Sequence, residues 1–272
     1  MKKYIGLLFV AILPMSHATL IQINFVDGTG GSVGTTSING STWNTVVSKS
    51  TTNPDVADLQ TSTGQNSGIS MTWIDGFGFA NNSRGEGGTG ASGTSNDGLS
   101  TYDADGVTLV DGGKFIPWAV MGSYNASNSG PAVNAFSFKS STQFFFDFHV
   151  AASREDTSGI TDTLYNVGGV YDSNTNTFVG GTTLTLNPST TQGTDLDYAV
   201  GRLTDGPSGF LAAWNGTEYE LTFQVAKDGS LGGSNARYLN GLVMETTVIP
   251  EPGTLVLLGI AFGTLMVFHR RR

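Results

Sequence analysis

The chain has 272 residues, no cysteine and a formal net charge of −9, with only 13% of its residues charged. The absence of cysteine excludes disulfides, thiol chemistry and cysteine-bound metals. Five of the 13 basic residues but only one of the 22 acidic residues lie in the two terminal segments, so residues 19–249 carry a charge near −13. Such a surface repels phosphate backbones, which argues against nucleic acid as a partner.

The N-terminus has the three parts of a secretory signal peptide. Residues 1–3 are basic at two positions, residues 4–13 are apolar, and Ser16-His17-Ala18 is a small-x-small cleavage site. The apolar run is too short to span a bilayer as a permanent helix. We therefore expect cleavage between Ala18 and Thr19 and export of the remaining chain.

Residues 19–249 have the composition of an all-β domain, because Gly, Ser, Thr and Asn are abundant and no sustained helical spacing of apolar residues occurs. Asp-Gly or Asn-Gly pairs, which favour tight turns, begin at residues 27, 39, 75, 97, 105, 111, 205, 215, 228 and 240. About 230 residues are enough for one large sandwich. We predict a single antiparallel β-sandwich, with one short helix at 55–59.

The apolar segments give the predicted strands in chain order. They are 20–26, 69–74, 107–110, 115–120, 143–151, 163–167, 178–180, 182–186, 210–214, 219–226 and 237–248. Residues 81–106 are nearly all small and polar, which predicts a long surface loop. The segment 238–243 is apolar on both faces, which predicts a central place in a sheet.

The strongest strand, 143–151, alternates between two faces. One face is wholly apolar and is predicted to lie on the core; it consists of Phe144, Phe146, Phe148 and Val150. The other face is predicted to be half solvated; it consists of Phe145, Asp147, His149 and Ala151.

Several segments of the second half resemble the jelly-roll, galactose-binding-like β-sandwich domains of bacterial exported proteins. They are Ala152-Ser153-Arg154, 163–168, Leu221-Thr222-Phe223 with Asp228-Gly229, and 238–242. The resemblance implies a jelly-roll-like sandwich whose loops at one end hold sugar or calcium. No ligand motif of these domains is present, so no binding residue is carried over.

Catalytic chemistry has few candidates. His149 is the single histidine of residues 19–249, and Asp147 shares its strand face. No G-x-S-x-G or H-E-x-x-H motif accompanies them, so we interpret the pair as ordinary strand-face residues and predict a protein that is not an enzyme.

Calcium and sugar are the ligands that remain open. Asp103 and Asp105, near Asp97 and Asp111, supply hard oxygen ligands, but the spacing lacks the closing glutamate of an EF-hand, and turns explain these Asp-Gly pairs without a metal. We predict no cofactor. Trp43, Trp118 and Trp214 suit stacking on sugars or burial in the core. A carbohydrate-binding module and a surface glycan hydrolase therefore remain as alternatives. Glycan hydrolysis needs a pair of carboxylates, and residues 19–249 contain only five glutamates, which makes the hydrolase the weaker alternative.

The C-terminal 23 residues contain three sequence features in order. Pro250-Glu251-Pro252 stops any helix, residues 254–268 form an uncharged apolar run, and Arg270, Arg271 and Arg272 end the chain. The run predicts a transmembrane helix of roughly 22 Å, shorter than the ~30 Å hydrocarbon core. The arginines hold their end in the cytoplasm, which orients residues before 250 to the outside.

This tail resembles the PEP-CTERM sorting signal of bacterial surface proteins. The resemblance implies that residues 250–272 are held in the inner membrane and processed by an exosortase, a membrane protease-transpeptidase. We therefore expect an exported structural or adhesive protein, anchored through its tail before processing and then found at the cell surface or in the exopolysaccharide matrix.

Overall fold

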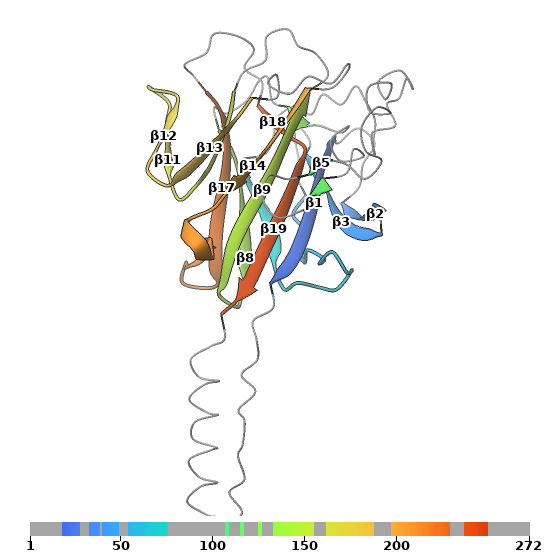
Figure 1. Cartoon of the computed structure of the whole chain (residues 1–272). Helices are drawn as coiled ribbons and strands as arrows, with labels where there is room; N and C mark the ends of the chain where they lie inside the picture. The colour runs from blue at the N-terminus through green and yellow to red at the C-terminus, as the bar shows by residue number, and fades with distance from the viewer. Residues whose placement is uncertain are drawn as a thin grey trace, which may run out of the picture.

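The computed structural model describes residues 18–27, 33–38, 40–48, 54–75, 107–108, 115–116, 125–126, 133–154, 162–187, 197–228 and 237–249. Within these ranges the chain forms strands and turns, and its helical content is the single 3-10 turn η4 (Gly206–Ser208). The strands build two facing sheets (Figure 1). The prediction of an all-β sandwich is confirmed, whereas the predicted loop at 81–106 lies outside the described residues.

The larger sheet contains seven strands. Its order is β14 (Asp197–Leu203), β9 (Phe144–Arg154), β19 (Gly241–Val248), β1 (Thr19–Asp27), β3 (Ser41–Ser48) and β2 (Gly34–Ile38), with β15 (Phe210–Leu211) also paired to β9. All its pairs are antiparallel except β1–β3. The central place predicted for 238–243 is confirmed for residues 241–243, because β19 lies between β9 and β1, whereas Tyr238 and Leu239 form a separate short strand in a two-stranded sheet.

The smaller sheet contains six strands. Its order is β13 (Thr182–Leu186), β10 (Thr163–Val167), β17 (Tyr219–Lys227), β8 (Val133–Ser140) and β4 (Ser70–Asp75), with β16 (Ala213–Trp214) also paired to β17. Consecutive strands β8, β9 and β10 alternate between the two sheets, as in a jelly roll. Three two-stranded sheets complete the described elements: β11 (Val170–Asp172) with β12 (Thr177–Val179), β18 (Tyr238–Leu239) with β7 (Asn125–Ala126), and β5 (Val107–Thr108) with β6 (Phe115–Ile116).

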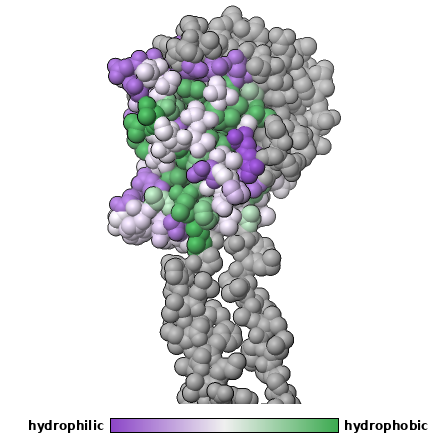
Figure 2. Space-filling view, turned by 60° about the vertical axis from the view of Figure 1, so that its left-hand side comes forward, coloured by the Kyte–Doolittle hydropathy of each residue, from purple (hydrophilic) through white to green (hydrophobic). Residues whose placement is uncertain are grey.

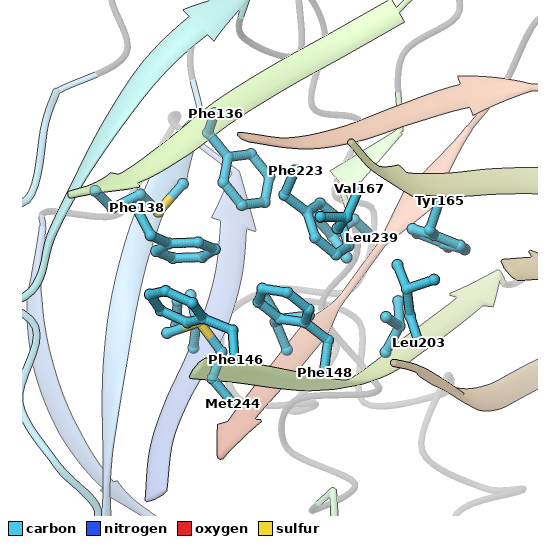
Figure 3. Packing of buried hydrophobic residues seen from close by; sticks show 14 of the residues in the cluster. Phe136, Phe138, Phe146, Phe148, Tyr165, Val167, Leu203, Phe223, Leu239 and Met244 are labelled. Atoms are coloured by element: carbon cyan, nitrogen blue, oxygen red, sulfur yellow. The ribbon is translucent and has the colours of Figure 1, made fainter. Parts of the chain in front are cut away.

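Phenylalanines from both sheets interdigitate to form the core (Figure 3). Phe146 and Phe148 project from β9 with parallel rings 5.9 Å apart, and Phe138 of β8 stacks on both. Phe136 and Phe223 stack on each other 5.1 Å apart in the smaller sheet. Stacked and edge-to-face rings add attraction beyond the burial of their area, so this cluster holds the two sheets together.

The second face of β9 differs from its prediction. The apolar face is buried as expected, but Asp147, His149 and Ala151 on the opposite face are also buried, with at most 8% exposure. The prediction of a half-solvated face is therefore wrong at these positions. Side chains of the flanking strands β14 and β19 lie beside these residues on the same face, and Arg202 of β14 contacts Asp147.

The predicted helix at 55–59 is also wrong. Val56 exchanges backbone hydrogen bonds of 2.9 Å with Met71 of β4, and the Leu59 N–H donates to the Ile69 carbonyl at 2.7 Å. Val56 and Leu59 are both buried. The segment therefore extends the edge of the smaller sheet, because tertiary partners satisfy the backbone groups that a helix would have paired internally.

The chain enters β1, its first strand, and leaves β19, its last strand, at the same end of the sandwich. Thr19, where β1 begins, is the antiparallel partner of Thr246, two residues before β19 ends. Figure 1 shows this end at the bottom of the body, and we call it the terminal end. The turn between β8 and β9 lies there too, since Phe144 pairs with Val248.

We predict that Phe148→Ala lowers the free energy of unfolding by about 3–5 kcal/mol, the range for removing a buried aromatic ring. Phe148 is 0% exposed and contacts the rings of Phe138, Phe146, Phe210 and Phe223. Denaturant unfolding of the full chain measures the change. Phe178→Ala is the control, because half-buried Phe178 packs on Tyr171 in the β11–β12 hairpin, and equal losses for the two variants would contradict this account of the core.

Candidate functional site

An ion pair lies on the outer face of the larger sheet, at the strand that carries His149. Arg202 Nε donates to Asp147 Oδ1 at 3.1 Å and to Oδ2 at 2.9 Å, and its Nη2 also bonds Oδ2. Arg202 is the cross-strand partner of His149 on β14, so Asp147 is its diagonal neighbour on the same face. This two-pronged contact is the strong form of an arginine–carboxylate pair.

Asp147 and His149 share a face, as predicted, but they do not form an exposed acid–base pair. Asp147 directs both carboxylate oxygens to Arg202, and His149 is only 2% exposed. A histidine acting as a general base must reach the proton that it removes. This geometry fits the interpretation of the two residues as structural members of the sheet.

We predict that Arg202→Met lowers the free energy of unfolding by about 1–2 kcal/mol, because Asp147 is left as a largely buried charge without its partner. The Arg202 side chain is 36% exposed and that of Asp147 is 12% exposed, so solvent screening limits the loss. The melting temperature of the full chain measures it. Lys139→Met is the control: its partners Glu218 at 3.4 Å and Glu220 at 4.0 Å are 34% and 26% exposed, more than Asp147, so a larger loss there would contradict the prediction.

A polar cluster that no local sequence pattern indicates occupies the end of the smaller sheet opposite the terminal end. The Asp228 N–H donates to the Asp162 carbonyl at 3.0 Å, which places the two aspartates side by side where β17 ends and β10 begins. Burial, and then the charge of Asp228, raise the pKa of Asp162 above its ordinary value of 3.8, against a hydrogen bond from Asn187. Nearby Arg237 is 4% exposed and donates to Asn134 Oδ1, and burial lowers its pKa to about 10.

This cluster predicts a pH dependence of stability. Because the folded protein holds the Asp162 proton more tightly than the unfolded chain, the folded state is favoured below pH 3.8 and loses stability as the pH rises through the raised pKa. Asp162→Asn should therefore stabilise the protein more at pH 7 than at pH 4. Asp228→Asn should act in the same direction, since it removes the second cause of the shift. Unfolding free energies at the two pH values measure this, and an Asp162→Asn effect independent of pH would refute it.

The candidate tryptophans have different environments. Trp43 on β3 is 0% exposed and belongs to the interior, whereas Trp214 on β16 is 56% exposed. Trp118 lies outside the described residues. Trp214 packs edge-to-face on Tyr219 with ring centres 5.1 Å apart. Of the two that the structure describes, Trp214 is the one exposed at the surface.

The Asn-Gly pair after Trp214 forms a tight hairpin between β16 and β17, as the sequence predicts. The Asn215 N–H donates to the Glu218 carbonyl at 3.0 Å, and Asn215 Oδ1 accepts from the N–H groups of Thr217 and Glu218, each at 3.0 Å. Gly216 adopts a φ of 106°, which a side chain would disfavour. Asn215 Nδ2 also donates to Glu220 Oε2 at 2.7 Å, so the hairpin is held firmly beside Trp214.

The remaining predicted sites lie at or beyond the edges of the described residues. Ala18 is exposed and Thr19 is the first residue of β1, so the predicted cleavage position falls directly before the sandwich and stays a prediction. The aspartates of the calcium hypothesis and the residues predicted for sorting and orientation all lie outside the described ranges: Asp97, Asp103, Asp105, Asp111, Pro250, Glu251, Pro252 and Arg270 to Arg272. Among the side chains that the structure does describe, no three His, Asp or Glu residues are grouped as metal ligands.

Comparison with known families decides the nature of the tail. Residues 248–272 match the PEP-CTERM protein-sorting motif. The chain ends in a PEP-CTERM sorting motif. This match begins at Val248, the last residue of β19, so the motif follows the sandwich without an intervening linker. It indicates export and anchoring in the membrane before processing by an exosortase, and it confirms the resemblance on which the sorting prediction rests. In the parts of the chain that the structure describes, no helix has the length and apolar character needed to cross a membrane.

Other comparisons are distant. No curated protein matches the sequence. Among solved structures, a non-crystalline-cellulose-specific carbohydrate-binding module, CBM28, aligns with 54% of this chain and 84% of its own at 10% identity and a TM-score of 0.23. The ANXUR2 extracellular domain of Arabidopsis thaliana aligns with 70% of this chain and 51% of its own at 16% identity and a TM-score of 0.30. At these scores neither likeness bears on function.

Proposed function

We propose that this chain is an exported, non-catalytic β-sandwich protein with a structural or adhesive role at the cell surface or in the exopolysaccharide matrix. Its tail is the substrate of an exosortase in the inner membrane. Pro250, Glu251 and Pro252 present an extended, unpaired backbone to that enzyme, because each proline fixes its own φ and favours an extended residue before it. Residues 254–268 span the membrane, and Arg270 to Arg272 keep the end of the tail in the cytoplasm.

The observation that carries this proposal is the sorting motif that starts where β19 ends. Because β1 begins at the same terminal end, both predicted targeting segments adjoin the sandwich on one side. The opposite end of the sandwich is then directed away from the membrane. A processed protein keeps every described strand, since the last of them ends at Val248.

The non-catalytic part of the proposal has support from the outer face of the larger sheet. The histidine available for acid–base chemistry is buried, and the carboxylate next to it on that face is committed to Arg202. The exposed surface that the structure describes includes turns and an aromatic hairpin, which suit contact with other molecules better than turnover of a substrate.

We predict that replacing Pro250, Glu251 and Pro252 together by alanine reduces release of the mature protein by about tenfold or more in a host with an exosortase, since the fixed extended backbone is lost. Mass spectrometry of the membrane and extracellular fractions measures release and shows whether Arg270 to Arg272 remain. Pro54→Ala with Pro207→Ala is the control, because both prolines are exposed in the sandwich. Secreted wild-type protein that still carries the three arginines would overturn the proposal, as would equal delivery of a chain ending at residue 249.

Two alternatives have separate tests. A carbohydrate-binding module predicts retention on a glycan array that is lost when exposed Trp214 is changed to alanine. A surface glycan hydrolase predicts turnover of a polysaccharide by the purified protein and loss of that turnover when one of two facing carboxylates is changed to its amide. Asp162 and Asp228 are the neighbouring carboxylates to change first.

A further inference from the structure

Two exposed apolar side chains lie at the terminal end of the sandwich. Leu211 is 47% exposed and Trp214 is 56% exposed, and half-buried Phe145 and Tyr219 lie beside them as their respective cross-strand partners, whereas exposed Ile74, Val170 and Val179 lie on other parts of the molecule. We call Leu211, Trp214 and their two partners the terminal rim. Figure 2 shows hydrophobic surface reaching this end of the body. Exposed large apolar residues that are grouped in this way mark contact surfaces.

Hydrogen bonds fix the terminal rim to the strand from which the sorting motif departs. The Ile249 N–H donates to the Gln143 carbonyl at 3.0 Å, and Gln143 Nε2 donates to the Ala212 carbonyl at 3.2 Å. The Ala212 N–H donates in turn to the Phe144 carbonyl at 3.1 Å. Ala212 lies between Leu211 and β16, so hydrogen bonds connect the segment that carries Leu211 and Trp214 to residue 249.

A close approach between the backbones of Gly209 and β9 holds β15, the strand of Leu211, in place. Gly209 precedes β15 with a φ of 80°, and a Cβ at this position would lie 2.2 Å from the carbonyl oxygen of Phe146 on β9. Only glycine permits both the backbone conformation and this distance. The rim is therefore a rigid part of the sandwich.

The length of the connection limits how far the rim lies from the membrane. Five residue steps join Ile249 to Thr254, the start of the predicted span, and they reach at most about 17 Å when fully extended. The headgroup layer on one side of a bilayer occupies roughly 5–8 Å of that distance. The terminal end therefore stands within about 10 Å of the headgroups whenever the tail is inserted.

The chemistry of the rim suits the headgroup region. Tryptophan and tyrosine prefer the interface between membrane and water, where an aromatic body and a polar group are both solvated. Glu218 and Glu220 flank Tyr219, the cross-strand partner of Trp214, and both contact Lys139. Because the acids outnumber the lysine, attraction to anionic lipids does not drive the contact, and it should be insensitive to salt.

We propose that the terminal rim rests on the outer headgroup layer of the membrane that holds the tail, with Leu211 and Trp214 in contact with lipid. The inference depends on the proposed insertion of residues 254–268. In this arrangement the rim sets the height at which residues 250–252 are presented to the processing enzyme, and the body does not swing freely on its tether.

The absence of cysteine allows a direct test on the full chain. Leu211→Cys is labelled with a fluorophore and reconstituted into phosphatidylcholine vesicles that contain headgroup-nitroxide lipid. Val179→Cys, which is 64% exposed on β12 and away from the terminal end, is the matched control. We expect the label at 211 to be quenched at least about twofold more than the label at 179, because apolar and aromatic side chains partition into the headgroup boundary. Trp214→Ser should reduce the difference in quenching between the labels at 211 and 179, and 0.5 M salt should not change that difference.

The outcomes separate this inference from the proposed function. If the protein does not float with the vesicles, the tail is not inserted and both proposals fail. If it floats but the two labels are quenched equally, the rim does not touch lipid and only this inference is overturned. The rim would instead be a sugar-binding surface if lipid quenches the two labels equally and if soluble β-glucan or dextran, added without vesicles, changes the fluorescence of the label at 211. Glu218→Cys in the neighbouring hairpin repeats the measurement if Leu211→Cys fails to fold.

Discussion

The pairing of β19 between β1 and β9 is the constraint on which the rest of the structure depends. β19 pairs with β9 from Gly241 to Val248 and with β1 through Thr246, so the last described strand fills the middle of the larger sheet. Its inward side chains, Leu242 and Met244, are completely buried in the core. The C-terminal tail is thus attached to a central strand of the larger sheet, and tension on the tail is transmitted to the interior of the sheet rather than to an edge.

The two sides of β9 use different physical means to hold their neighbours. Toward the smaller sheet, stacked phenylalanines supply non-directional attraction across the sandwich. On the outer face, the Asp147–Arg202 pair supplies a directional contact between β9 and β14. The phenylalanines join the sheets, and the ion pair favours one register of the outer strand, since a shift by one residue would place Arg202 on the wrong face.

Much of the strand layout is visible in the sequence because apolar alternation is strong in several segments. The predicted strands 163–167 and 182–186 have the observed bounds, and the apolar face from Phe144 to Val150 is buried as predicted. β8 was missed although it lies between β17 and β4. Its polar residues Asn134 and Ser137 are buried beside apolar ones, so the pattern that marks a strand is hidden by tertiary hydrogen bonding. β2, β3 and β14 were missed as well, and of these β2 has a single apolar residue, Ile38.

The candidate sites were less predictable than the fold. The tail could be recognised because its three parts are contiguous in sequence. The Asp147–Arg202 pair joins residues 55 positions apart, and Asp162 meets Asp228 only where two strands pair. Such partners are set by topology. The sequence shows Asp228 as one turn signal among ten, and nothing local distinguishes it from the others.

The position of β19 also governs the order of assembly outside the cell. A chain that crosses a membrane from its N-terminus delivers β1 and β9 early, yet the sheet keeps a gap between them until the final strand has emerged. Thr246 must then hydrogen-bond the carbonyl of Thr19, 227 residues away, which is a slow closure for an unfolded chain. The inserted tail would hold the unfinished sandwich beside the bilayer during that delay, so the segment that is later cut off would first serve as a tether for folding.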